Sequence, residues 1–189
     1  MNRQSLTVRD AIIGRRSIKL FNGQPVDRDA IVQILEDATW APNHGMRNPW
    51  RFVMATGEGY ENLLPVIRGL AIPNWEELSE DVLERQMSKF TTVGGVVFVI
   101  VPEDARQKER LEDFAAASAL VQNAQLLAWD QGIGTCWKTP PFLDHPTFRE
   151  HLGVQQGERI MSMLQFGYYD KEPKGRERTP VNELLTELK

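Results

Sequence analysis

Two short arginine-rich segments of this chain are candidates for a phosphate-binding site. Arg15, Arg16 and Ser17 stand together near the N-terminus, and Arg176 and Arg178 stand two positions apart near the C-terminus. Guanidinium groups bind phosphate oxygens through paired hydrogen bonds, and a neighbouring hydroxyl adds another. If the fold brings the two groups together, they would hold a phosphate dianion. The alternative is a solvated basic face.

A polar loop is the second candidate for a site. Residues 41–49 lie between Trp40 and Trp50, are dense in turn-forming residues, and include His44 and Asn48. Loops of this kind often carry binding sites, although an ordinary helix-to-strand connection remains the alternative.

A third candidate follows the single cysteine. Lys138 and Thr139 could bind an anion or the polar edge of a ring. Cys136 itself, beside Trp137, is interpreted as a small buried apolar residue rather than a nucleophile.

The residue motifs of several other kinds of chemistry are absent from the sequence. The sequence has no phosphate-binding P-loop, no nucleophile elbow and no HExxH motif. Three histidines and one cysteine are too few and too badly spaced for a zinc site. Gly132-Ile133-Gly134 follows a predicted helix rather than a strand, so it is interpreted as a helix stop and not as a dinucleotide fingerprint.

Composition bounds the class of protein. The 189 residues are 41% hydrophobic and 25% charged, which is typical of one globular domain over 1–189. The net charge is −4, although residues 1–26 carry +4, so we expect no nucleic-acid partner. The longest apolar run, 93–101, is too short to span a membrane, and the N-terminus resembles no signal peptide. With a single cysteine, a cytoplasmic location fits best.

Helices that could position these groups are predicted from caps and periodicity. Thr7 is expected to cap a short helix that ends near Arg15, and Asp27 a second helix that Pro42 stops. A polar helix is expected over 74–89, capped by its first residue.

Three strands and a core helix are predicted further along. The strands are 51–56, 93–101 and 159–168. Residues 93–101 are apolar on both faces, which predicts a central strand covered on both sides. Apolar residues all around 114–129 predict a buried core helix.

The remaining segments complete the expected architecture. A helix capped by Asp144 or Thr147 should end at Gly153, and the tail from about 170 to 189 should be extended. Leucines near the end of that tail have no local core, which favours docking on a second copy of the chain. Helices and strands therefore mix around one sheet.

Six segments along nearly the whole chain form an ordered set. They are Arg15-Arg16-Ser17-Ile18-Lys19 with Phe21, Ala41-Pro42-Asn43-His44, Asn48-Pro49-Trp50-Arg51-Phe52-Val53, Val121-Gln122-Asn123-Ala124-Gln125-Leu126, Gly132-Ile133-Gly134-Thr135, and Phe166-Gly167-Tyr168 followed by 176–180. Together they resemble the nitroreductase family of FMN-dependent NAD(P)H oxidoreductases, in its compact branch.

The resemblance implies a fold, an assembly and site residues. The fold would be α+β, a central mixed β-sheet flanked by helices, in an intertwined homodimer with one FMN at each of two sites between subunits. The residues that would hold the FMN phosphate and ribityl chain are Arg15, Arg16 and Ser17, with Arg176 and Arg178. Those that would lie near the flavin ring are Trp40 and His44 from the partner subunit, Asn48 at a position where the family commonly has glutamine, and Trp137, Lys138 and Thr139.

The resemblance also implies an activity. The enzyme would take hydride from NAD(P)H onto FMN and pass two electrons to a nitroaromatic, quinone or similar acceptor by a ping-pong mechanism. The flavin would carry the chemistry, so no catalytic side chain or metal is expected. Two alternatives stay open: a protein that binds flavin or another phosphorylated ligand without turnover, and a family branch with other flavin chemistry, such as flavin destruction or reductive dehalogenation.

Overall fold

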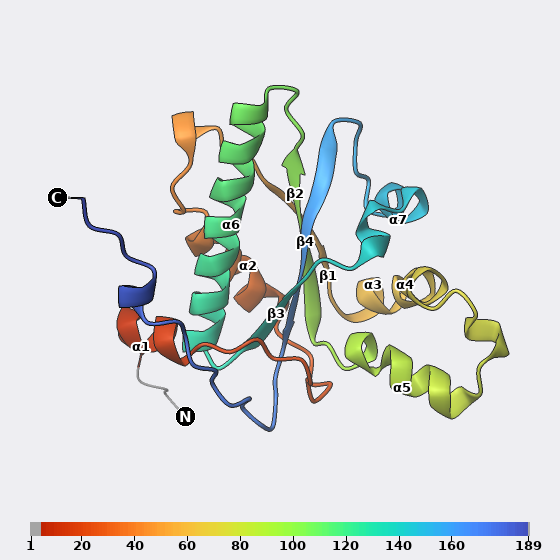
Figure 1. The fold of residues 1–189 in the computed structure, drawn as a ribbon. Coiled ribbons are helices and arrows are strands. Elements are labelled where there is room, and N and C mark those ends of the chain that lie inside the picture. Colours follow the sequence, from red (N-terminus) through yellow and green to blue (C-terminus); the bar gives the residue numbers. More distant parts are fainter. Residues whose placement is uncertain (1–4, 189) are drawn as a thin grey trace.

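The computed structural model describes residues 5–188 and places a four-stranded sheet between two helical layers (Figure 1). The strands are β1 (Arg51–Ala55), β2 (Gly95–Pro102), β3 (Gly134–Lys138) and β4 (Glu158–Gly167). Their order is β1-β2-β4-β3, and all three pairings are antiparallel. The parallel part of the expected mixed sheet is a single bridge between Ser17 and Thr135. Arg3, counted in the basic N-terminus, and Lys189, the end of the tail, lie outside the described residues.

Strand β2 is the centre of the core, as its sequence predicts. Val96, Phe98 and Ile100 join one apolar cluster, whereas the alternate valines 97, 99 and 101 join another. Successive side chains of a strand point to opposite faces, so one strand contributes to two cores. Both faces of the sheet are therefore covered by helices.

One face is covered by one N-terminal helix and the long central helix. These are α2 (Arg28–Ala38) and α6 (Gln107–Asp130), with α1 (Val8–Gly14) packed near the end of α6. Thr7 and Asp27 cap α1 and α2 through their side chains, which confirms both predicted helix starts.

The other face is covered by helices that follow β1 and β3 in the chain. They are α3 (Gly57–Glu61), α4 (Leu64–Ala71), η2 (Trp75–Glu77), α5 (Glu80–Thr91), η3 (Pro141–Asp144) and α7 (Pro146–His151). Figure 1 shows α3, α4 and α5 grouped to one side of the sheet, away from α6. Phe98 of β2 packs against Phe148 of α7 with ring centroids 5.5 Å apart.

Two helix predictions are wrong in detail. The polar helix expected over 74–89 is broken into η2 and α5, because the chain becomes extended at Leu78 and Ser79 before α5 begins. Helix α7 is capped by neither Asp144 nor Thr147. The ring nitrogen Nδ1 of His145 accepts the hydrogen bond from the backbone of Thr147 instead.

The long helix α6 is less buried than its composition predicts. Ala117, Leu120 and Ala124 are fully buried against the sheet, but Phe114 is 44% exposed. Helix α6 begins seven residues before the predicted start. The sheet and α2 pack only against its inner side. Leu111 and Phe114, near the start of α6, therefore remain exposed in the single chain.

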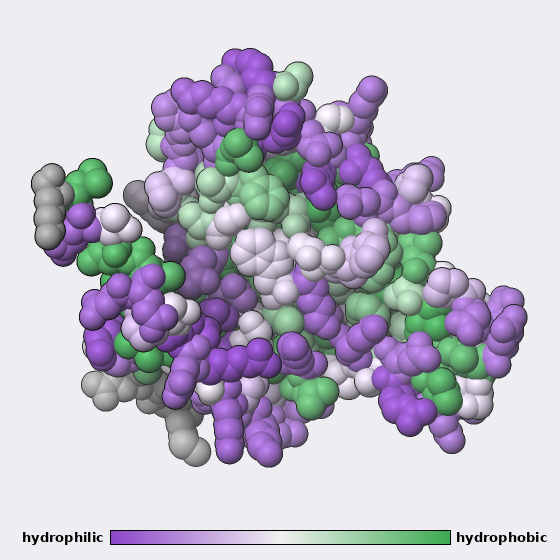
Figure 2. All heavy atoms as spheres, in the orientation of Figure 1, coloured by the Kyte–Doolittle hydropathy of each residue, from purple (hydrophilic) through white to green (hydrophobic). Residues whose placement is uncertain are grey.

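The C-terminal tail is extended, as predicted. Beyond β4 the only regular element among the described residues is the short turn η4 (Val181–Glu183), and residues 170–188 are exposed. Figure 2 shows apolar side chains at the surface where this tail runs past α1. The exposed apolar residues there are Val8, Ile12 and Ile13 of α1, and Val181, Leu184, Leu185 and Leu188 of the tail.

Candidate functional site

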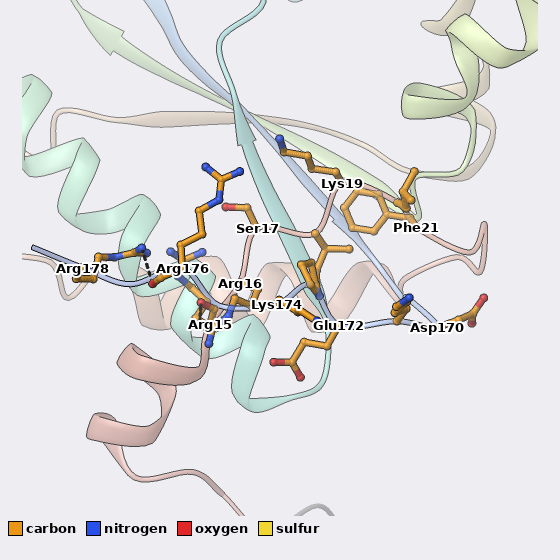
Figure 3. Close-up of a pocket in the computed structure, with 14 residues that line it drawn as sticks. Arg15, Arg16, Ser17, Lys19, Phe21, Asp170, Glu172, Lys174, Arg176 and Arg178 are labelled. Carbon is orange, nitrogen blue, oxygen red and sulfur yellow. Dashed lines mark hydrogen bonds between the residues drawn. The ribbon is translucent and has the colours of Figure 1, made fainter.

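The two arginine groups meet in one groove. The groove has a volume of about 910 Å³ and runs between the segment after α1 and the segment after β4 (Figure 3). The residues that line it are Arg15, Arg16, Ser17, Ile18, Lys19, Leu20, Phe21, Asp170, Lys171, Glu172, Pro173, Lys174, Arg176 and Arg178. The labelled arginines gather at one end, whereas Phe21 and Asp170 lie at the other. Segments about 160 positions apart in the sequence thus form one basic surface.

The arginines of the groove have no carboxylate partners. Among residues 5–188, no ion pair within 4 Å involves Arg15, Arg16, Arg176 or Arg178. Nη1 of Arg16 donates to the backbone carbonyls of Ile13 and Arg15, at 2.7 Å and 2.9 Å. Nε and Nη1 of Arg15 and Nε of Arg16 are buried from solvent and have no hydrogen-bond partner among the described residues. Buried donors are normally paired, so these atoms suit an acceptor that is not part of the chain.

The arginine end of the groove is electrostatically unfavourable without a bound anion, because like charges lie close together there. Burial lowers the pKa of Arg15, and the neighbouring charges of Arg16 and Arg178 lower it further. A bound dianion would reverse the sign of this local field and stabilise all three guanidinium groups.

Local structure explains how these side chains come to line the groove. The chain leaves α1 at Arg15 in an extended conformation, and the backbone N–H of Ile18 then donates to the carbonyl of Thr135 in β3 at 2.9 Å. Ile18 is buried, so the alternation of an extended segment turns Ser17 and Lys19 to the outside. Lys19 was missed as a site residue in the sequence, although its position two residues after Ser17 is the signal that could have found it.

The tail crosses the arginines where a glycine allows it. A Cβ added to Gly175 would lie 2.6 Å from Nη2 of Arg16, which is closer than side chains approach one another. The tail thus passes close to this guanidinium at a residue without a side chain, and Arg176 and Arg178 follow at the same end of the groove.

Trp137 and Lys138 end strand β3, Thr139 follows them, and none of the three lines the groove. β3 is an edge strand of the sheet, and its bridge to Ser17 covers only Thr135. Lys138 is half-buried, and burial lowers its pKa, with smaller contributions from Lys89 and Lys19. Trp137 packs against the apolar cluster on the α6 side of the sheet, whereas Nζ of Lys138 lies 5.7 Å from the ring centroid of Phe90 on the other side. Of the three predicted residues, only Lys138 therefore adds a positive charge near the edge of β3.

Cys136 is buried, as predicted. Burial raises the pKa of its thiol, which opposes formation of the nucleophilic thiolate.

The loop with Trp40, His44 and Asn48 is not brought to the groove within one chain. It contains η1 (His44–Met46), and Trp40 is 88% exposed. Arg47 of this loop bonds to Asp113 near the start of α6, whereas the backbone of Leu6, just before α1, bonds to Asp130 at the end of α6. These two carboxylates are 17 positions apart in one helix, which corresponds to roughly 25 Å at 1.5 Å per residue. Figure 1 shows the loop and α1 at opposite ends of α6.

The fold and the groove define an α+β protein with a basic groove at the edge of its sheet. The sequence model of the nitroreductase family matches residues 12–168. The chain belongs to the nitroreductase family.

Individual relatives agree with this assignment. YfhC of Bacillus subtilis, whose provisional name is NAD(P)H nitroreductase, is 37% identical over 98% of this chain and 96% of its own length. The crystal structure of a nitroreductase-like family protein from Bacillus cereus has a TM-score of 0.84 at 34% identity and covers 98% of this chain and 97% of that chain. An FMN- and NADPH-dependent nitroreductase, NfnB from a Sphigopyxis strain, shares the fold with a TM-score of 0.79 at 18% identity, over 96% of this chain and 98% of that chain.

Two further properties concern the whole described chain. Among residues 5–188, no helix is both long and apolar enough to cross a membrane. The same residues contain no cluster of three or more side chains of the kinds that ligate metal ions.

Proposed function

We propose that this protein is an FMN-dependent oxidoreductase that uses NAD(P)H to reduce a small aromatic acceptor, a nitroaromatic or a quinone. The observation that carries the proposal is the groove in which Arg15 and Arg16 present buried donors without partners, in a chain of the nitroreductase family. The names of the relatives, which include a nitrobenzene nitroreductase at 25% identity, support the same chemistry.

The groove residues fit a flavin mononucleotide. A terminal phosphate would accept hydrogen bonds from Arg15 and Arg16, with Arg176 and Arg178 adding positive charge from the tail, and the Ser17 hydroxyl would serve the phosphate or the ribityl chain. Bound FMN supplies a ring that accepts two electrons from NAD(P)H and passes them to the acceptor.

The remaining side chains would orient the ring and shape its electrostatics. Trp137 and Thr139 would lie along one side of it, and Lys138 would place a positive charge nearby. Because the two substrates would use the same ring in turn, the kinetics should be ping-pong.

We also propose a homodimer that shares its two sites. Trp40, His44 and Asn48 lie at the far end of α6 from their own groove, so they could contribute only to the groove of a second copy. Leu111 and Phe114 at the start of α6 and the exposed leucines of the tail supply apolar surface that a partner would bury.

The visible spectrum of the purified protein is the first test. We expect a yellow protein that releases FMN on denaturation and sediments as a dimer. Anaerobic mixing with NADPH or NADH should bleach the flavin in a single turnover, and a nitroaromatic should restore its colour. A flavin that stays oxidised with both donors would favour the binding-protein alternative, and breakdown of the flavin itself would favour another branch of flavin chemistry.

A further inference from the structure

The loop after α2 has an unusual backbone. Gly45, Met46 and Asn48 all have positive φ angles, of 65°, 52° and 47°. The left-handed region is unfavourable for residues other than glycine, and such conformations persist only where surrounding contacts impose them. The loop therefore needs an anchor.

Arg47, which lies between two of these residues, is that anchor. Its Nε and Nη2 donate to Oδ1 of Asp113 at 3.0 Å and 2.7 Å, and Nη2 also donates to Glu112 at 3.3 Å. The other side-chain hydrogen bonds of 43–48 stay within 41–48. Among the described hydrogen bonds, Arg47 alone ties the side chains of this loop to another element.

The acceptor on α6 is a buried charge. Asp113 is only 4% exposed, on a helix that packs against the sheet. A buried carboxylate is costly unless a cation and hydrogen bonds compensate it, so Asp113 holds Arg47 at a fixed place. The hydrogen bonds with Asp113 also raise the pKa of Arg47, which therefore stays charged.

We propose that Arg47 and Asp113 are positioning residues for the shared FMN site. They hold loop 40–48 in the conformation in which Trp40, His44 and Asn48 complete the groove of the partner subunit. Neither residue touches the cofactor. The inference rests on the proposed function, because it requires that FMN binds in the groove.

The first test separates positioning from stability. Arg47→Met leaves Asp113 buried without a partner, so both the melting temperature of the apoprotein and FMN affinity should fall, the affinity by about tenfold. In Arg47→Met/Asp113→Leu the uncompensated charge is gone and the melting temperature should recover, whereas FMN affinity should stay low. Arg106→Met, which removes ion pairs to Asp104 and Glu109 at the start of α6, is the matched control and should bind FMN normally.

A mixed dimer tests which site the loop serves. One chain carries Arg16→Ala and the other, with a different tag, carries Arg47→Met. If the loop serves the partner's groove, one site in this dimer has both its groove and its loop intact and should bind FMN with wild-type affinity. Dimers with both substitutions in each chain should have no such site.

The outcomes are distinguishable. Wild-type protein that binds no FMN would refute the proposed function. Wild-type protein that binds FMN would refute the positioning role if Arg47→Met binds equally well, if affinity recovers together with stability in the double variant, or if the mixed dimer has no wild-type site.

Discussion

The two ends of helix α6 use arginine in opposite ways. At its start, Arg47 donates to two carboxylates and fixes a loop with left-handed residues. Near its end, beyond α1, Arg15 and Arg16 stand close together with buried nitrogens that no described residue satisfies. The sequence contains an Arg–Asn pair at the first place and an Arg–Arg–Ser run at the second, and nothing in the residue types alone separates the two roles.

The difference shows how to distinguish a structural arginine from a ligand-binding one. A guanidinium that meets a buried carboxylate has its charge compensated within the folded chain. Removing it leaves the carboxylate buried without a partner, which destabilises the folded state. A guanidinium held among like charges weakens the folded state until an anion arrives. Removing the first kind should harm the apoprotein, and removing the second should harm only the complex.

The largest effect is expected for Arg15→Met. It removes a charge-assisted partner worth roughly 1.5–3 kcal/mol, so FMN affinity should fall about ten- to a hundredfold. The folded state depresses the pKa of Arg15 and thus disfavours the cation, so the apoprotein should melt at the same or a higher temperature. Quenching of flavin fluorescence and thermal melts measure the two quantities. Arg9→Met, on α1 and outside the groove, is the control, and a clear loss of apoprotein stability in Arg15→Met would contradict the comparison.

Inorganic phosphate should stabilise the apoprotein through the same arginines. At ten times its dissociation constant, a ligand that binds only the folded state adds about 1.4 kcal/mol to the unfolding free energy. Melting curves with increasing phosphate at constant ionic strength should therefore shift upwards for the wild type and not for Arg15→Met. Equal shifts in both proteins would mean that phosphate binds elsewhere.

Arg51→Met should affect stability alone. Arg51 forms a bidentate ion pair with Glu158, at 2.7 Å and 2.6 Å, and lies outside the groove. Partly exposed pairs are worth up to about 1 kcal/mol, so the melting temperature should fall slightly and FMN affinity should not change. The hydrogen bond from Arg51 lowers the pKa of Glu158 below the usual value of 4.5. The pair therefore stabilises the fold at and above that pH. The difference in melting temperature between the variant and the wild type should shrink as the pH falls below it. A difference that grew on acidification would contradict this assignment.

The smallest effect is expected for Cys136→Ala. The thiol is buried, and its pKa is raised. FMN binding and bleaching by NADPH should be retained, and iodoacetamide should label the native wild-type protein far more slowly than the unfolded protein. An inactive variant that still binds FMN would show that the sulfur takes part in the reaction.

Local sequence signals predicted the elements whose stability is itself local. The caps at Thr7 and Asp27 and the apolar run of β2 act within a few residues, and each lies where the pattern indicates. The 74–89 helix was wrong because a polar pattern of suitable length does not specify where extended backbone interrupts it. The full burial expected of α6 was wrong for the single chain, since composition does not reveal how many layers cover a helix.

The same contrast between local sequence signals and tertiary arrangement holds for the site residues. Residue types and a family resemblance suggested the Arg15–Ser17 and Arg176–Arg178 groups, but only the bridge from Ser17 to Thr135 and the passage of the tail over Arg16 bring them together. Lys19 enters the groove through the alternation of an extended segment, which becomes evident once Ile18 is seen to be buried.

Residues that are close along the chain were enough to predict the local elements, the family and the residue types that suit a phosphorylated cofactor, because caps, periodicity and motifs depend on neighbours in the chain. Only the three-dimensional arrangement shows which arginines meet a carboxylate and which, among the described residues, do not. Arg47 and Asp113 are 66 positions apart, and Arg15 and Arg178 are farther apart still. Electrostatic partners follow distance in space, which local sequence patterns do not encode.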